Sequence, residues 1–225
     1  MDGLRYGNMH PMTQPTQVLA GKPPRKISFE EFLEWGGENQ HVEWVNGEII
    51  EMAPVGDAHQ ALGLWLITLL KLYVDSHDLG AIRYETFQMK AGPDLPSRAP
   101  DILFVAKRNL SRLKTNHLAG PADLVVEIIS PGSGATDRGD KYYEYERGGV
   151  REYWLLDPRR KQAEFYQLGR DRVYHLMPVN DGVFRSQVLK GVWLELQWLW
   201  TKPLPPTPQI WERWQSEPRL QRGSR

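Results

Sequence analysis

The chain has 225 residues and a mass of 26.0 kDa, which fits one ordinary domain or one domain with tails. It contains no cysteine, which excludes a disulfide scaffold, a thiolate zinc site, an iron–sulfur cluster and cysteine catalysis. Basic and acidic residues both number 28, so a nucleic-acid partner would need a local basic surface. The start lacks an apolar signal core and the longest apolar stretch, residues 61–74, is too short to span a bilayer, so we expect a cytoplasmic protein without membrane contact.

The two ends of the sequence have the composition of tails. Residues 1–26 are rich in Pro, Gly, Gln and Thr, whereas residues 201–225 begin with a proline-rich run and become polar and Arg-rich. Within the second segment, Trp211 and Trp214 are candidates to dock onto the body of the protein. We therefore expect a single domain over residues 27–200.

The first third of this domain predicts a helix, a hairpin and a second helix. Ser28 and Glu31 have the spacing of a capping box, which begins a short helix. Asn46-Gly47 between apolar runs indicates a type I′ hairpin turn. A helix over about residues 57–76 is apolar on nearly all sides, so we expect it to be buried or to pack against a second subunit.

The rest of the domain is expected to be mostly strands. They are predicted at residues 82–90, 101–106, 124–130, 151–157, 163–168, 173–177 and in a hairpin over 181–196, with a helix over 137–147. The continuous LVVEIIS run of the third strand indicates burial on both faces. This order predicts an α/β or α+β fold, with a mixed sheet flanked by helices and extended by hairpins.

Two carboxylates stand in apolar surroundings. Asp101 opens the strand in RAPDILFV, and Glu127 lies in the middle of ADLVVEIISP. An ionised carboxylate in an apolar strand is costly unless a cation satisfies it. A structural salt bridge to an arginine would explain Glu127 alone. Two such acids on paired strands can also converge on one Mg²⁺ or Mn²⁺ ion.

Several motifs accompany these acids over residues 27–196. They are the run EWVNGEIIEMAP with His59 after it, Pro100-Asp101-Ile102, EIISP beginning at Glu127, the segment Asp137 to Lys141, and GVREYWLLD beginning at Gly149. Together they resemble the restriction endonuclease family sometimes called Uma-two, within the PD-(D/E)xK nuclease superfamily. The resemblance implies a restriction-endonuclease-like fold and a divalent-metal-dependent endonuclease that hydrolyses DNA phosphodiester bonds.

The resemblance also implies the roles of the central residues. Asp101 and Glu127 would be catalytic and would bind Mg²⁺ or Mn²⁺, with the backbone carbonyl of Ile128 as a third ligand. The lysine expected two residues after the glutamate is Ile129 here, and Lys141 on the following helix is the matching position. Lys141 would orient the attacking water or neutralise the developing negative charge.

Simpler explanations exist for Lys141 and for three second-rank candidates. Lys141 shares a helix face with Asp137 and Tyr145, so it could be a solvated lysine paired with one of them, which would leave catalysis weak or absent. The candidates Glu43, His59 and Glu85 could bind metal, water or phosphate. They could equally be an exposed hairpin glutamate, a histidine at a helix start and a surface or salt-bridged glutamate.

A basic block runs from Arg98 to His117, mostly after Asp101. Its members are Arg98, Lys107, Arg108, Arg112 and Lys114. These side chains could line the path of a DNA backbone. A homodimer would suit a duplex that is cut on both strands, and the apolar helix would provide its interface.

Other chemistries fit less well. The segment SPGSGATDRGDK lacks the G-x-x-x-x-G-K-[ST] order of a phosphate-binding loop, because Asp140 follows Gly139. Ser130 and Ser133 lack the G-x-S-x-G context of a hydrolase, and the six histidines show no zinc-binding spacing. The remaining alternative is a non-catalytic DNA-binding or dimeric interaction module that retains the nuclease fold.

Overall fold

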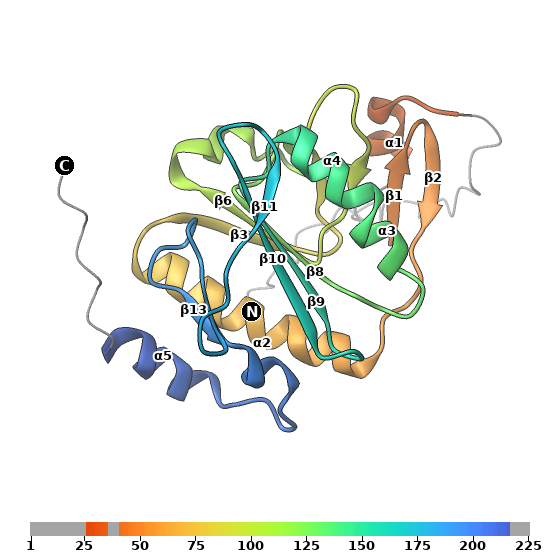
Figure 1. Cartoon of the computed structure of the whole chain (residues 1–225). Helices are drawn as coiled ribbons and strands as arrows, with labels where there is room; N and C mark the ends of the chain where they lie inside the picture. Colours follow the sequence, from red (N-terminus) through yellow and green to blue (C-terminus); the bar gives the residue numbers. More distant parts are fainter. Residues whose placement is uncertain (1–25, 36–40, 217–225) are drawn as a thin grey trace, which may run out of the picture.

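A six-stranded mixed sheet forms the centre of the protein (Figure 1). The structure is a computed structural model that describes residues 26–35 and 41–216, so the predicted tail 1–26 lies almost wholly outside the described residues. In spatial order the strands are β11 (Tyr174–Leu176), β10 (Gln162–Leu168), β9 (Glu152–Asp157), β8 (Leu124–Ile128), β6 (Ile102–Ala106) and β3 (Gly80–Tyr84). Only the β8–β9 pair is parallel. The predicted mixed sheet is therefore confirmed, and β8 is buried along its whole length.

A second, smaller sheet carries the N-terminal hairpin. Its strands are β2 (Glu48–Glu51), β1 (Val42–Val45), β5 (Ser97–Arg98), β4 (Gln88–Lys90) and β7 (His117–Ala119). The turn residues Asn46 and Gly47 have φ values of 51° and 89°, as a type I′ turn requires, so the predicted hairpin is confirmed. The single strand expected over 82–90 was wrong, because the chain turns after Tyr84 and places β3 and β4 in different sheets.

Two helices cover the central sheet, α2 (Asp57–Ser76) on one face and α4 (Asp140–Gly148), preceded by α3 (Gly134–Arg138), on the other (Figure 1). Helix α1 (Phe29–Trp35) packs against the hairpin of the smaller sheet, and α5 (Thr207–Ser216) packs against α2. The capping box of α1 is confirmed, since Ser28 Oγ accepts from the Glu31 N–H at 3.1 Å and Glu31 Oε2 accepts from the Ser28 N–H at 2.8 Å. The single helix expected over 137–147 was wrong, because Gly139 interrupts it with non-helical dihedrals of −108° and −92°.

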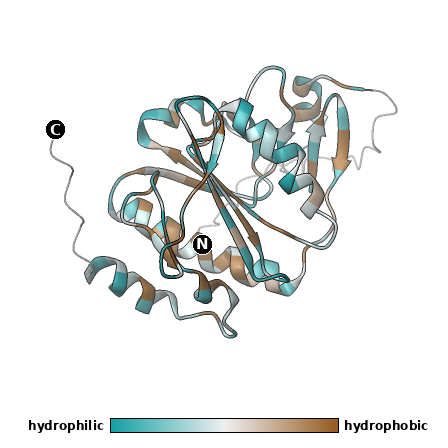
Figure 2. Ribbon diagram, in the orientation of Figure 1, coloured by the Kyte–Doolittle hydropathy of each residue, from teal (hydrophilic) through white to brown (hydrophobic). Residues whose placement is uncertain are grey.

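Alternation along β8 and β9 sends their side chains into two separate cores. Val126 and Trp154 pack with α2 on one face of the sheet. Val125 and Tyr153 pack with Tyr145 of α4 on the other face. Hydrophobic residues accordingly concentrate in the strands and α2, whereas α4 is mostly hydrophilic (Figure 2). Glu127 follows Val125 by two residues, so its side chain points toward α4 rather than α2.

The C-terminal segment covers α2. Part of the segment expected as a tail forms α5, which is preceded by the short hairpin of β12 (Val183–Arg185) and β13 (Trp193–Glu195) and by a 3-10 helix (Leu196–Trp200). Trp214 is buried, and its indole N–H donates to the Trp193 carbonyl at 2.8 Å. The apolar surface of α2 is therefore largely covered within one chain, although Leu64 remains 67% exposed. None of the helices in the described ranges is long and apolar enough to cross a membrane.

Candidate active site

A cavity of about 300 Å³ lies where β8 ends and β6 begins. Because these strands are antiparallel, with Ile102 opposite Val126, the start of one lies beside the end of the other. This pairing brings Asp101 and Glu127 to the same cavity, although 25 residues separate them in the sequence. The carboxylates, histidines and cations that line the cavity are His41, Glu43, Glu51, His59, Glu85, Arg98, Asp101, Glu127, Asp137 and Lys141.

Asp101 is held in place by α2 and β8. Its Oδ2 atom lies 3.1 Å from Nε2 of His59, in the first turn of α2, and accepts a hydrogen bond from the Ile128 N–H at 2.5 Å. Burial alone would raise the pKa of Asp101, but His59 and this backbone N–H outweigh burial and lower it. The same contact raises the pKa of His59 despite its burial. The lowered pKa favours the carboxylate form of Asp101, and the raised pKa favours the protonated form of His59.

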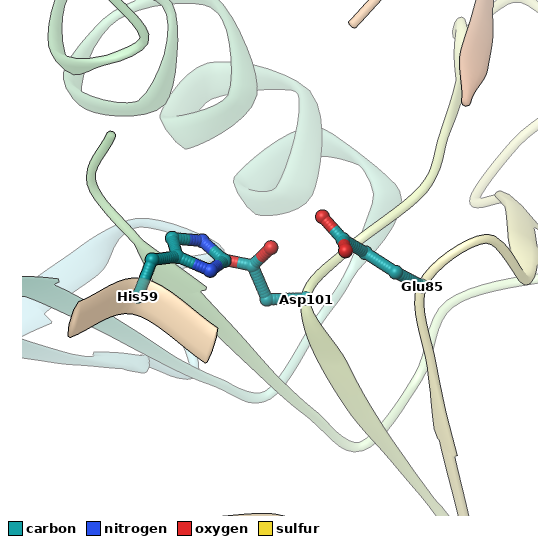
Figure 3. A group of neighbouring side chains, drawn as sticks. All are labelled: His59, Glu85 and Asp101. Carbon is teal, nitrogen blue, oxygen red and sulfur yellow. The ribbon is translucent and has the colours of Figure 1, made fainter. Parts of the chain in front are cut away.

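Glu85 completes a group of three potential metal ligands. One ligand atom from each of His59, Glu85 and Asp101 lies within 4.8 Å of the other two. Figure 3 shows the Asp101 carboxylate between the His59 ring and the Glu85 carboxylate. Burial and the nearby Asp101 charge raise the pKa of Glu85, while His41 contacts its other side at 3.1 Å. A cation between these three groups would relieve the repulsion of the two carboxylates.

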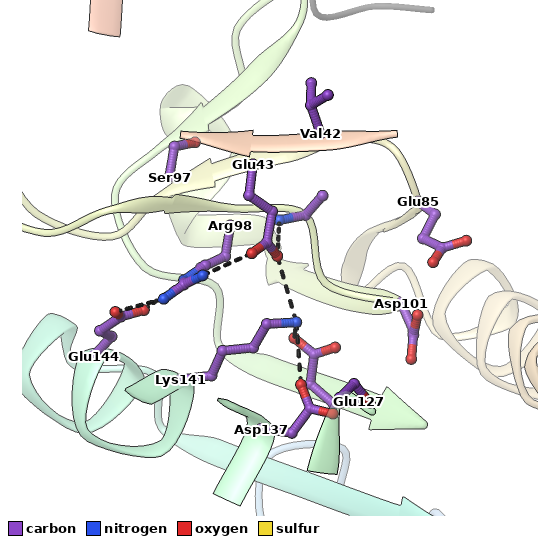
Figure 4. A network of polar contacts seen from close by, with 12 residues as sticks. Val42, Glu43, Glu85, Ser97, Arg98, Asp101, Glu127, Asp137, Lys141 and Glu144 are labelled. Atoms are coloured by element: carbon purple, nitrogen blue, oxygen red, sulfur yellow. Dashed lines mark hydrogen bonds and ion pairs between the residues drawn. The ribbon is translucent and has the colours of Figure 1, made fainter. Parts of the chain in front are cut away.

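Lys141 is a buried cation among carboxylates, with only 2% of its surface exposed. Its Nζ atom lies 3.1 Å from Glu127, 3.3 Å from Asp137 and 3.4 Å from Glu43 (Figure 4). Burial would lower the pKa of Lys141, but these carboxylates raise it well above the ordinary value. The explanation of Lys141 as a solvated lysine was therefore wrong, although Asp137, the partner named in it, is one of its three partners.

Glu127 is a buried member of this network of charges. Besides Lys141, its Oε1 atom accepts a hydrogen bond of 2.6 Å from the Tyr145 hydroxyl. Burial raises the pKa of Glu127 well above the usual value, and the negative charges of Asp101 and Asp137 raise it further against the pull of Lys141. The salt bridge that could explain this buried glutamate exists, but its cation is a lysine rather than an arginine. That lysine shares its charge with two other acids.

Glu43 belongs to the interior and not to an exposed hairpin. Its side chain is buried, and its Oε2 atom accepts a hydrogen bond of 2.7 Å from Nη1 of Arg98. Arg98 also donates to both Glu144 oxygens at 2.7 Å (Figure 4). Burial raises the pKa of Glu43, but Lys141 and Arg98 outweigh this and lower it. The hairpin sheet is thus joined to α4 through one arginine.

Arg98 is the one member of the basic block among the described residues that line this cavity. Arg98 is only 5% exposed and ion-paired within the protein, so the expectation that it lies along a DNA backbone was wrong. Lys107, Arg108 and Arg112 lie in the 3-10 helix Lys107–Arg112, which follows the other end of β6. Five strand residues separate this helix from Asp101, or roughly 17 Å at about 3.3 Å per residue. Lys114 lies just beyond it.

Four residues that contact the site were not predicted as site residues: His41, Asp137, Glu144 and Tyr145. The i, i+4 spacing of Asp137 and Lys141 did indicate their ion pair, which was named as the alternative to catalysis. No local pattern connects His41 to Glu85 or Glu144 to Arg98, because these partners are 44 and 46 residues apart. They meet only after the two sheets have packed.

The charge balance of the cavity fits a divalent cation. Six carboxylates line it, against two permanently charged cations, Arg98 and Lys141, among the described residues. Nδ1 of His59 is buried without a hydrogen-bond partner. Carboxylate oxygens are the ligands that Mg²⁺ and Mn²⁺ prefer. Among the described residues, His59, Glu85 and Asp101 have ligand atoms close enough together to hold an ion, whereas Glu127 lies outside this group.

Comparisons with known proteins found a relative, a solved structure with the same fold and a family model. The chain is 26% identical over 151 residues to an uncharacterized protein of Synechocystis sp., covering 66% of this chain and 78% of that protein. A crystal structure titled as a "putative nuclease belonging to DUF820" from Anabaena variabilis shares the fold with a TM-score of 0.63 and 19% identity, covering 77% of this chain and 97% of the other. A family model, Uma2, described as "Putative restriction endonuclease", matches residues 29–197, well over half of the chain. The chain therefore belongs to the Uma2 family.

Proposed function

We propose that this protein is a divalent-metal-dependent endonuclease that hydrolyses phosphodiester bonds of DNA. One observation carries the proposal: Asp101 and Glu127, from adjacent ends of paired strands, line one acidic cavity together with Lys141. The membership of the Uma2 family supports it. A divalent ion, Mg²⁺ or Mn²⁺, would supply Lewis-acid activation of a phosphate oxygen and of the attacking water.

The residues of the cavity would divide the work. Asp101 would be the central metal ligand, because it lies next to His59 and Glu85 and its Oδ2 atom is held by the Ile128 N–H. Glu127 and the Ile128 carbonyl would complete the coordination from the end of β8. Each of these groups is fixed by a strand end or a helix end, so little ordering would accompany binding of the ion.

Lys141 would act through its charge. Its ammonium lies within 3.4 Å of three carboxylates, and its charge opposes the rise that burial causes in the pKa of Glu127. During hydrolysis a water oxygen forms a bond to phosphorus and the bond to the leaving oxygen breaks. The lysine would orient that water or offset the negative charge that accumulates on the phosphate oxygens.

Metal titration and plasmid cleavage test the proposal. We expect wild-type protein to bind Mn²⁺ in isothermal titration calorimetry and to cleave supercoiled plasmid in the presence of Mg²⁺ or Mn²⁺. Asp101→Asn and Glu127→Gln should each weaken Mn²⁺ binding by at least about 100-fold and abolish cleavage. Asp75→Asn is the matched control, since Asp75 is an exposed carboxylate on α2 that pairs with Lys71.

The outcomes separate the two candidate functions. Unchanged Mn²⁺ affinity in Asp101→Asn would contradict the proposed metal site. Mn²⁺ binding and DNA binding by wild-type protein without strand cleavage would instead identify a non-catalytic DNA-binding module that retains the nuclease fold. Glu43→Gln adds a check on the second-rank role of Glu43: it should impair cleavage less than Glu127→Gln if Glu43 positions Lys141 rather than binding the metal.

The homodimer stays a prediction. Its original basis, the apolar surface of α2, is now largely accounted for by contacts within the chain. Light scattering coupled to gel filtration at several concentrations tests it, and a monomer at all of them would contradict it.

A further inference from the structure

A second cavity, of about 540 Å³, lies at the opposite end of the central sheet from the acidic cavity. It is formed where β6 ends and where the parallel strands β8 and β9 begin. The lining residues with charged or polar side chains are Arg108, Asn109, Arg112, Asp123, Arg151 and Arg172. We call this cavity the arginine cleft. Its four guanidiniums come from three separate segments, so the fold and not a run of basic sequence assembles them.

The buried carboxylate of Asp123 holds two of the four arginines in place. It is 1% exposed, and its Oδ1 atom lies 2.6 Å from Arg108 and 3.5 Å from Arg151. Its Oδ2 atom accepts from Asn109 and from the Ala106 N–H at 2.9 and 2.8 Å. The side chains of Arg108 and Arg151 are nevertheless 61% and 51% exposed. A hidden carboxylate therefore holds two guanidiniums whose outer faces remain open to solvent.

The other two arginines are positioned by backbone carbonyls. Arg112 donates to the Pro121 carbonyl at 2.9 Å, and Arg172 donates to the Arg147 carbonyl, near the end of α4, at 3.5 Å. A carbonyl orients a guanidinium without neutralising it. Asp123 is the single carboxylate among the described lining residues, so the cleft carries a positive excess of three. Such a concentration of charge in a concave site attracts anions.

The side chains that line the cleft favour phosphate groups over other anions. Arginine forks match the oxygen geometry of phosphate and bind it with paired hydrogen bonds. The described lining contains no aromatic side chain, so it offers no surface for stacking a base or a nucleoside. Gly149 has a φ of +91°, and a side chain there would come within 3.4 Å of the Arg172 guanidinium. Because Gly149 has no side chain, no atom of it crowds the Arg172 guanidinium in the cleft.

We propose that the arginine cleft is a phosphate-binding site, separate from the hydrolytic cavity, that takes phosphate groups either from a nucleic-acid backbone or from a small phosphorylated molecule. The residues Arg108 and Arg112 of the sequence-predicted basic block belong to this cleft, whereas Asp101 and Glu127 belong to the cavity at the other end of the sheet. The site recognises phosphate oxygens without reading bases. It does not depend on the proposed hydrolysis.

Binding measurements in EDTA test the site without contributions from a metal. Pyrophosphate is the probe in one arm, followed by calorimetry, and a 20-base-pair duplex is the probe in the other, followed by fluorescence anisotropy over a series of salt concentrations. We expect dissociation constants in the millimolar range or tighter for at least one probe. Arg112→Gln and Arg172→Gln should each weaken binding by about tenfold or more. Arg160→Gln, an exposed arginine next to Asp157, should leave it unchanged.

Each outcome either overturns the proposed site or identifies which kind of phosphate compound it binds. Pyrophosphate binding that both variants weaken identifies a site for small phosphorylated molecules. Binding of the duplex alone, with a salt slope reduced by about one in each variant, identifies a backbone contact. Binding of neither probe, or binding that the variants leave unchanged while thermal unfolding shows they are folded, overturns the proposal. Arg172→Lys should restore part of the affinity. Cleavage is not measured, so this test and the hydrolytic test fail independently.

Discussion

The two ends of the central sheet handle charge in opposite ways. At the end where β8 stops, Glu127 and Lys141 are almost wholly buried and pair with each other, and Lys141 also pairs with Glu43 and Asp137. At the end where β8 starts, the carboxylate of the arginine cleft, Asp123, is buried, but the two arginines that it holds are half exposed. The first arrangement needs every charge to be compensated inside the protein, because burial of an ion is costly. The second leaves its charges available to solvent or to a ligand.

The difference distinguishes buried charges, on which the stability of the fold depends, from exposed charges, on which it does not. In the acidic cavity, removal of one ion leaves its partners buried and unpaired, so the fold should depend on each member. In the arginine cleft, water can solvate what is left when one of the exposed arginines is replaced, so such a substitution should hardly change stability. Stability measurements on both ends, taken together, therefore test the comparison directly.

The largest effect is expected for Lys141→Met. Three buried carboxylates would lose the cation they share, so the free energy of unfolding should fall by about 3–5 kcal/mol at pH 7, measured by urea denaturation. Lys71→Met is the control, because Lys71 is exposed and pairs with Asp75 across one turn of α2, and it should change stability by less than about 0.5 kcal/mol. Equal losses in the two variants would show that the cavity does not rely on internal pairing.

Arg98→Met should produce a loss of about 3 kcal/mol at pH 7 that becomes smaller in acid. In the wild type, Lys141 and Arg98 hold the pKa of Glu43 below its ordinary value. The ionised Glu43 therefore contributes its full share to the free energy of unfolding at any pH above the ordinary pKa, and this share is lost as the pH falls through the lowered pKa. Without Arg98, burial raises this pKa and Glu43 takes up a proton at higher pH. The gap between variant and wild type should thus shrink as the pH approaches about 4.3. A gap independent of pH between 7 and 4 would contradict this account.

Asp123→Asn probes the one buried charge of the arginine cleft. The amide cannot accept from all of Arg108, Asn109 and the Ala106 N–H, so we expect the free energy of unfolding to fall by about 1–3 kcal/mol in chemical denaturation. Asp78→Asn, which alters an exposed partner of Lys107 close by, should have little effect. If both substitutions are neutral, Asp123 does not organise the cleft.

The smallest effect is expected for Arg151→Gln. Its side chain is 51% exposed, and Asp123 keeps its closer partner Arg108, so stability should change by less than about 0.5 kcal/mol in the same assay. A loss above about 2 kcal/mol would mean that this end of the sheet depends on internal ion pairing as the acidic end does. The two ends of the sheet would then not differ in how they handle charge.

Much of the fold could be predicted from local sequence signals. Ser28 with Glu31 indicated the start of α1, Asn46-Gly47 indicated the hairpin, and the apolar run around Glu127 indicated a strand buried on both faces. Each of these signals depends on neighbours within a few residues. The breaks at Tyr84 and Gly139 were missed, because apolar and helical composition continues across both positions.

The candidate site could be predicted only in part, for a related reason. The apolar surroundings of Asp101 and Glu127 were visible in the sequence, and antiparallel pairing accounts for their meeting. The burial of Glu43 and Arg98 depends on how the hairpin sheet packs against α4, which no local pattern records. Closeness in the sequence also misled: Arg108 follows Asp101 by seven residues, but a strand carries it to the far end of the sheet.

The position of Glu127 in β8 has a consequence for how the strand is assembled. Val126 and Glu127 face opposite sides of the sheet, one toward α2 and the other toward the lysine of α4. A slip of the strand by a single residue would exchange the two sides and push a carboxylate into the hydrocarbon layer against Leu66 and Leu69. The acid proposed to serve catalysis thus also penalises misaligned pairing, and its replacement by valine should permit alternative alignments that the natural sequence rejects.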